Sequence, residues 1–299
     1  KILFLGLLFE LSDELKLIKK SKGSIQNQDN KFQWALIKGL DSVNSNNIDI
    51  INVIPVGSYP KRFTDIKVKR KEWHSLSRSS NIQVGFLNLP FLKHLFIALN
   101  CRKEIKKWIK NNPSDELHIM LYSTYLPFLR AIYKLDNRIK TSIIVIDIPE
   151  YNNLSNEKIG FFKKLLINYS NKNVYKSLKT INNFVLLTEQ MKYPIQVLNR
   201  PYIVVEGIYE VSDYDKCDNI SNISENNKKI ILYSGTLHYK FGITKLLDAF
   251  QLIKNPNYEL WICGSGDTEQ IIKKVLSIDN RIKFYGFIPS DEVKKLQLK

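Results

Sequence analysis

The sequence predicts an α/β protein of two segments, each with its own parallel sheet covered by helices. Strand-like apolar runs alternate with helical patterns through residues 1–205, and strand, glycine turn and helix follow one another twice within residues 229–289. Parallel strands need crossover connections, usually helices, so this alternation is typical of parallel sheets. A polar stretch at 199–228, rich in Asn, Ser and acidic residues, has the composition of a hinge. We therefore expect one domain over residues 1–205 and a second over residues 206–299.

The first segment carries six apolar runs of strand length and four stretches with helical spacing of apolar residues. The strand-like runs lie at 1–5, 48–54, 82–85, 117–121, 141–146 and 183–187. The helical stretches lie at 32–40, 102–109, 127–135 and 161–178. Between the first run and the first helix, the polar stretch Ser21–Lys31 contains Gly23 and is a candidate ligand loop.

Glycine turns in the second segment point to phosphate binding. The apolar strand 230–233 leads into Gly235 and a polar loop with Lys240, and the strand 258–263 leads into Gly264-Ser265-Gly266-Asp267. A phosphate can approach backbone N–H groups where no Cβ intrudes, and a following helix N-terminus favours its negative charge. Tight-turn geometry alone explains one such turn equally well. Two turns at matching positions, with a lysine in the first, favour phosphate binding.

The net positive charge of the chain is confined to the first segment. The chain has a formal net charge of +16. Residues 1–205 hold 32 Lys and Arg against 16 Asp and Glu, whereas residues 206–299 hold 13 of each. Such a field suits an anionic partner, namely acidic lipid headgroups, a phosphorylated substrate or nucleic acid, although a solvated basic face gives the same letters. Residues 86–110, apolar and then basic, fit either an amphipathic element on an anionic membrane or a buried helix with a basic outer face.

Composition indicates the cellular compartment of the protein. Three scattered cysteines, Cys101, Cys217 and Cys263, argue for a reducing compartment and against a disulfide framework or zinc site, so we expect a cytoplasmic protein. No apolar run approaches the roughly 20 residues of a transmembrane helix. The sequence begins without Met and stops inside a helical pattern that starts near Ser290, so we expect a C-terminal truncation.

The second segment resembles glycosyltransferase family 4, whose members have the GT-B fold of two Rossmann-like domains facing across a cleft. The resemblance rests on Tyr233-Ser234-Gly235-Thr236-Leu237, Lys240-Phe241-Gly242, Leu247-Asp248-Ala249-Phe250, the Gly264–Asp267 turn and the segment Arg281–Pro289. Blocks in the first segment look like those of a polysaccharide-synthesis branch, at Ile146–Tyr151, Leu187–Met191 and Val204–Ile208.

The resemblance implies roles for individual residues. Gly235, Thr236 and Lys240 would hold the donor diphosphate, and Gly264 and Gly266 would shape the pocket floor. The backbone near Phe287 and Ile288 would face the nucleotide base. Asp147 would be the catalytic carboxylate, facing the cleft toward the acceptor or the transferring sugar. The candidate ligand loop with Gly23 would lie on the acceptor side.

Departures from the family pattern limit that transfer of roles. Thr236 stands where the family often has Arg, and Ile146 stands where a His commonly precedes the aspartate. The Glu-x7-Glu motif that binds the donor sugar would lie beyond Lys299. We therefore expect this chain by itself to catalyse poorly.

The expected activity is transfer of a sugar from a nucleotide-sugar to a lipid-linked saccharide acceptor, with retention of configuration, in cell-surface polysaccharide synthesis. The resemblance implies a hexosyltransferase that needs no metal or other cofactor and works at the inner face of the cell membrane. A catalytically idle sugar-nucleotide binding or scaffold protein remains an alternative. An NAD-dependent enzyme is disfavoured, because Gly6 is the single glycine after the first strand. No nucleic-acid-binding motif accompanies the charge.

Overall fold

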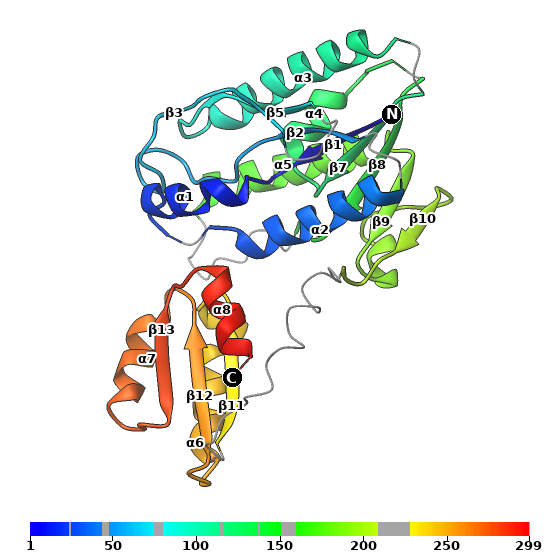
Figure 1. Ribbon diagram of the computed structural model, residues 1–299. Helices are drawn as coiled ribbons and strands as arrows, with labels where there is room; N and C mark the ends of the chain where they lie inside the picture. Colours follow the sequence, from blue (N-terminus) through cyan, green and yellow to red (C-terminus); the bar gives the residue numbers. More distant parts are fainter. Residues whose placement is uncertain are drawn as a thin grey trace. The chain divides into compact units, whose positions relative to one another are not determined.

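The chain forms two compact units in a computed structural model. The structure describes residues 1–23, 25–43, 48–74, 80–113, 116–136, 138–150, 160–208 and 228–298, except for the side chains at 162, 163, 290 and 291. The first unit comprises Lys1–Lys22 and Gln26–Tyr209, and the second consists mainly of Glu210–Lys299. Each unit is a sheet covered by helices, as the alternation of strands and helices predicts (Figure 1).

The first unit is built on an eight-stranded sheet. Its strands, in chain order, are β1 (Ile2–Gly6), β2 (Ile48–Asn52), β4 (Lys71–Trp73), β5 (Asn81–Gln83), β7 (His118–Tyr122), β8 (Lys140–Val145), β9 (Asn183–Leu186) and β10 (Tyr202–Val204). Their order across the sheet is β10-β9-β8-β7-β1-β2-β5-β4. All neighbours are parallel except β4, which pairs antiparallel with β5 at the edge. A separate antiparallel pair joins β3 (Lys67–Val68) to β6 (Phe86–Leu87).

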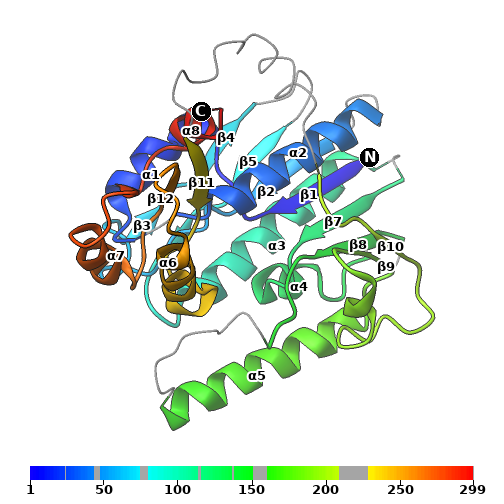
Figure 2. The ribbon, with the colours of Figure 1, turned by 90° about the horizontal axis from the view of Figure 1, so that it is seen from below.

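Helices cover both faces of this sheet. They are α1 (Glu14–Lys20), α2 (Asn27–Val43), α3 (Lys93–Asn111), α4 (Leu126–Ile132) and α5 (Phe161–Leu178), with short 3-10 turns η1 (Leu11–Asp13) and η3 (Glu189–Lys192). Ile37 of α2 packs on one face against Phe4 and Ile50. On the opposite face, the indole of Trp108 in α3 donates to the buried Asp49 of β2 at 2.8 Å, and α4 and α5 follow α3 side by side (Figure 2).

Two predicted element boundaries differ from the structure. The stretch Ser21–Lys31 was expected to be a loop, but α2 begins at Asn27, so this prediction was wrong for its second half. The third helix begins at Lys93 rather than Arg102. The first turn of α2 is polar, which hides the apolar period that predicts helices, whereas the first two turns of α3 are mostly apolar on both the buried and the exposed side and so show no one-sided period.

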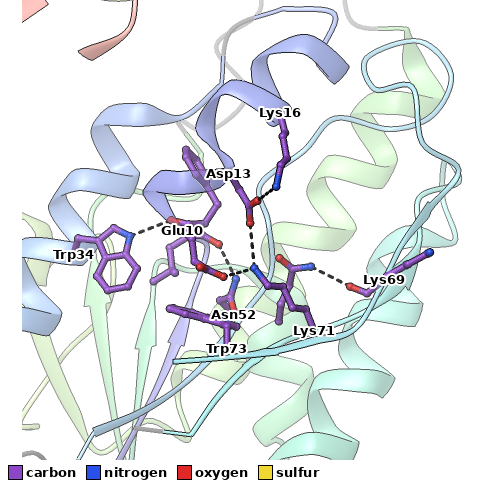
Figure 3. A network of polar contacts seen from close by, with 11 residues as sticks. Glu10, Asp13, Lys16, Trp34, Asn52, Lys69, Lys71 and Trp73 are labelled. Atoms are coloured by element: carbon purple, nitrogen blue, oxygen red, sulfur yellow. Dashed lines mark hydrogen bonds and ion pairs between the residues drawn. The ribbon is translucent and has the colours of Figure 1, made fainter. Parts of the chain in front are cut away.

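Polar side chains hold the backbone directly after β1, and Figure 3 shows two of them, Trp34 and Asn52. The Gln33 amide, on α2 and fully buried, accepts from the Leu7 N–H and donates to the Leu7 carbonyl, both at 2.8 Å. Asn30 accepts from the Phe9 N–H at 2.9 Å, and Trp34 donates to the Phe9 carbonyl at 3.0 Å. Asn52 of β2 donates to the Leu8 carbonyl at 2.8 Å. A loop that would otherwise bury unsatisfied backbone groups is thereby fixed in one conformation.

The second unit is a three-stranded parallel sheet in the order β11 (Lys229–Ser234), β12 (Tyr258–Cys263) and β13 (Ile282–Gly286). Its helices are α6 (Ile243–Leu252), α7 (Glu269–Leu276) and α8 (Ser290–Gln297), with the turn η5 (Tyr239–Phe241) before α6. The buried Glu259 on the central strand accepts from Lys228, Lys283 and the indole of Trp261. Burial alone would raise the pKa of Glu259, but these three donors outweigh it and lower the pKa to about 2.

We expect Gln33→Leu to destabilise the first unit by about 2–4 kcal/mol, because it leaves the N–H and carbonyl of Leu7 buried without partners. Gln28→Leu, an exposed position on the same helix, is the matched control and should change stability by less than about 0.5 kcal/mol. Urea unfolding measures both. Equal stabilities for the two variants would show that the Gln33 hydrogen bonds do not hold the loop.

Candidate functional site

The carboxyl edge of the second sheet gathers the residues that the glycine turns single out. Gly235 and Thr236 follow β11, Gly264 and Gly266 follow β12, and Phe287-Ile288 follow β13. Because the three strands are parallel, their ends meet at one edge. Hydrogen bonds tie the ends together: the Gly235 N–H donates to the Cys263 carbonyl at 3.0 Å, and the Gly264 N–H donates to the Gly286 carbonyl at 2.8 Å.

Two glycines allow the loops after β11 and β12 to touch. A Cβ on Gly264 would lie 1.8 Å from the Gly235 carbonyl oxygen, and one on Gly266 would lie 2.1 Å from the Leu237 carbonyl oxygen. Gly264 also has a φ of +139°, which L-residues rarely adopt. The Leu237 carbonyl accepts from both the N–H and the hydroxyl of Thr268. These glycines therefore let backbone pack on backbone where the two loops meet.

Lys240 lies on η5, in the loop that connects β11 to α6, and its side chain is exposed. The loop is anchored by Asp267, whose carboxylate accepts from the Tyr239 N–H at 2.9 Å and lies 3.2 Å from the His238 ring. Gly242, with a φ of +77°, makes the left-handed turn that starts α6. Sequence reasoning assigned no role to Asp267 or His238. The contacts of Asp267 with Tyr239 and His238 hold the loop in which Lys240 is exposed.

The other strand ends at this edge differ in exposure. Thr236 is exposed, and its carbonyl accepts from the Tyr233 hydroxyl at 3.0 Å. Phe287 is 37% exposed, and Ile288 is half-buried. The edge thus offers an exposed cation, the exposed Gly266 and a partly exposed aromatic ring. That set suits a ligand with both phosphates and a planar base.

A second group of polar residues lies at the switch point of the first sheet. The chain order reverses direction between β1 and β7, and ligands of open α/β sheets bind outside the strand ends at such a point. Tyr122 ends β7, and its hydroxyl donates to a carboxylate oxygen of Asp29, in the first turn of α2, at 3.4 Å. Asp147 follows the end of β8 and is exposed.

The charge of Asp147 affects the pKa of Asp29. Burial raises the pKa of the Asp29 carboxyl above its ordinary value, the charge of Asp147 raises it further, and the Tyr122 hydrogen bond opposes both. Partial removal of solvent from its carboxylate also raises the pKa of Asp147. Asp29 and Tyr122 were missed at the level of sequence. The signal was the polar set Asp29, Asn30 and Gln33, whose spacing puts them on one face at the start of a helix.

Gly23 lies in the turn between α1 and α2, with a φ of +151° and no atom within 4 Å of a built Cβ. The conformation explains the glycine without a ligand.

Comparison with protein families identifies the second unit. Residues 217–299 match the family described as Glycosyl transferases group 1. The second unit carries a group 1 glycosyltransferase domain. The strand-end loops with Gly235, Lys240 and Gly264 all fall inside the matched range. The remaining residues, 1–216, lie outside the match, and no curated protein sequence matches the chain.

Solved structures share the fold of the whole chain. The α,α-trehalose 6-phosphate synthase from Burkholderia multivorans aligns with a TM-score of 0.59 and 10% identity, over 97% of this chain and 72% of that one. The sucrose-phosphate synthase from Thermosynechococcus elongatus gives 0.55 and 12%, over 96% and 70%. The lipopolysaccharide outer core galactosyltransferase WaaB gives 0.50 and 14%, over 100% and 71%. The fold is therefore α/β and GT-B-like, as expected.

The described residues were also compared with the requirements of a metal site and of a membrane-spanning helix. No group of three or more His, Cys, Asp or Glu side chains lies positioned to hold a metal ion within the described ranges. Among the helices that the structure describes, none combines the length and apolar character needed to cross a membrane.

We expect Gly264→Ala to destabilise the second unit by about 2–4 kcal/mol, because the new methyl group meets the Gly235 carbonyl in a left-handed conformation. Gly235→Ala is the matched control. A Cβ there makes ordinary contacts, at 3.4 Å and beyond, with the Tyr233 ring. Thermal unfolding should separate the two variants clearly. If Gly264→Ala unfolds at the temperature of the wild type, the loops are not held by backbone contact.

We expect Asp29→Asn to gain stability relative to the wild type as the pH rises. The folded pKa of Asp29 lies above its ordinary value of 3.8, so the wild type loses stability as pH rises through that window, and a neutral amide does not. Urea midpoints of both proteins at about pH 3.5 and about pH 7 measure the difference. A stability difference that is the same at both pH values would contradict the burial of this charge.

Proposed function

We propose that this protein is a glycosyltransferase that moves a sugar from a nucleotide-sugar donor to a saccharide acceptor, with retention of configuration. The observation that carries the proposal is the coincidence of the group 1 match with three strand-end loops that present Gly235, Lys240 and Gly264 at one edge. In the reaction, the bond from the anomeric carbon to the diphosphate oxygen breaks. A bond from that carbon to an acceptor oxygen forms, and the acceptor hydroxyl loses its proton.

The donor diphosphate would bind at the edge of the second sheet. Its negative charge increases as the sugar leaves, and stabilising that charge is the main task of the site. The ammonium of Lys240, the backbone at the exposed Thr236 and the N-terminus of α6 are the groups available there. The base would lie near Phe287 and Ile288. We expect a hexosyl donor and binding that does not require a metal ion.

The acceptor hydroxyl would bind in the first unit, at the switch point of its sheet. Asp147 would be the carboxylate that accepts a hydrogen bond from this hydroxyl, and a raised pKa makes it a better proton acceptor. The carboxylate of Asp29, which accepts a hydrogen bond from the neutral Tyr122 hydroxyl, would add a second negative charge near it. Gly23, in the turn before α2, would border the same acceptor side.

A lipid-linked saccharide at the inner face of the cell membrane is the acceptor we propose, within cell-surface polysaccharide synthesis. The net charge of +16 in residues 1–205 supports it, because the surface of an anionic membrane attracts such a domain. The protein would thus be cytoplasmic and peripheral to the membrane.

The test is a thermal-shift series with UDP, GDP, ADP, CMP and NADH, with and without Mg²⁺. A ligand at about 100 times its dissociation constant adds roughly 2.7 kcal/mol of stability. We expect one nucleoside diphosphate to raise the unfolding temperature, with or without Mg²⁺. Lys240→Ala should lose most of that shift, and Lys245→Ala, exposed on α6, should keep it.

Other outcomes would name other functions. A shift with NADH alone would indicate a dinucleotide enzyme. A nucleoside diphosphate shift without sugar transfer to any saccharide would indicate a binding or scaffold protein. No shift with any nucleotide would contradict the donor site.

A further inference from the structure

Helices α3, α4 and α5 lie side by side on one face of the first sheet (Figure 2). The side chains exposed on α3 and α5 are mostly apolar or basic. We call the exposed side chains of these helices and of Phe91 the α3–α5 face. Each helix buries its other side. Ile97, Cys101 and Ile105 of α3 and Val174 and Leu178 of α5 have 4% or less of their surface exposed.

The outer side of α3 carries one continuous stripe. It runs through Leu92, Leu95, Leu99, Lys103, Lys106 and Lys110, in steps of three and four residues that keep every member on the same side of the helix. All six are exposed, the leucines to 46%, 47% and 55%. Phe91, directly before the stripe, is 89% exposed.

Helix α5 repeats this arrangement, which sequence reasoning did not detect. Its exposed stripe runs through Phe161, Leu165, Tyr169, Lys172 and Lys176, again apolar first and basic second. Each helix leads into a parallel strand of the same sheet, α3 into β7 and α5 into β9, so the two helices run in the same direction. Their apolar halves therefore lie at the carboxyl edge of the sheet, and their lysines lie at the other end.

Acidic residues are almost missing from these three helices. Their sequences contain eleven Lys and Arg, six on α3, one on α4 and four on α5, against the single acidic residue Glu104. Glu104 is 5% exposed and is paired with Arg70 and Lys107. The outward charge of the described side chains is thus uniformly positive.

We propose that the α3–α5 face docks on an anionic lipid membrane. Exposed leucine and aromatic side chains would enter the boundary between headgroups and acyl chains, and the lysines would contact anionic headgroups. A partner bound by charge alone would have no use for the apolar halves, whose exposure in water is costly. This inference rests on the proposed function in that a lipid-linked acceptor would be met at the same membrane, near the carboxyl edge of the sheet.

Vesicle flotation of the whole chain without nucleotide tests the docking separately from the donor site. We expect binding to phosphatidylcholine vesicles with about 30% phosphatidylglycerol at about 0.1 M salt, and little binding to pure phosphatidylcholine or at about 1 M salt. The variant Lys103→Gln/Lys106→Gln/Lys110→Gln should weaken binding roughly 100-fold, at about 1 kcal/mol for each lysine. The variant Leu95→Ser/Leu99→Ser/Leu165→Ser should weaken it at least about tenfold.

Matched control variants lie on the second unit. Lys245→Gln/Lys273→Gln/Lys274→Gln removes the same charge, and Leu252→Ser/Ile278→Ser removes side chains that are 77% and 76% exposed. Both should bind vesicles as the wild type does. Absence of binding at low salt, or binding that the α3–α5 variants leave unchanged, would overturn the proposal. Loss with the lysine variant but not with the leucine variant would overturn it in favour of a soluble polyanion.

Discussion

The first unit depends on hydrogen bonds to the buried backbone of residues 7–9. This segment follows the central strand β1 at the switch point of the sheet, where a ligand site requires an open edge rather than further strand pairing. Its buried N–H and carbonyl groups are satisfied by side chains from α2 and β2, chiefly those of Gln33 and Asn52. Those hydrogen bonds fix the start of α2. The position of Asp29, and with it the Tyr122 contact, follows from that start.

The second unit solves the same problem with glycine instead of polar side chains. Gly264 and Gly266 let two loops meet backbone to backbone, so the edge of the sheet stays open and rigid. Asp267 then ties the first loop to the second through Tyr239. The result is a pair of loops held to each other, with the exposed cation Lys240 on the first. In our proposal these loops are organised before the diphosphate binds, which reduces the entropy lost on binding.

Charge separates the roles of the two units. The second unit is neutral by sequence and binds, in our proposal, a small anion with a few precisely held groups. The first unit spreads its positive charge over helices that also expose leucine and phenylalanine. At the same time it keeps two carboxylates, Asp29 and Asp147, close enough to raise the pKa of Asp29. Ionised carboxylates in partly buried positions lower stability, which suggests that they are retained for a function.

The sequence by itself determined the two parallel sheets, because alternating apolar runs and helical spacing are local patterns that a parallel sheet requires. It also determined which second-unit residues lie at the sheet edge, since Gly235, Gly264 and Phe287 each follow a strand directly. The tertiary structure alone decided the pairing of Asp29 with Tyr122, residues 93 positions apart in the chain. It also decided that α3 and α5 lie on the same face of the sheet, with α4 between them. Contacts of this range depend on the order of strands in the sheet, and no local pattern encodes that order.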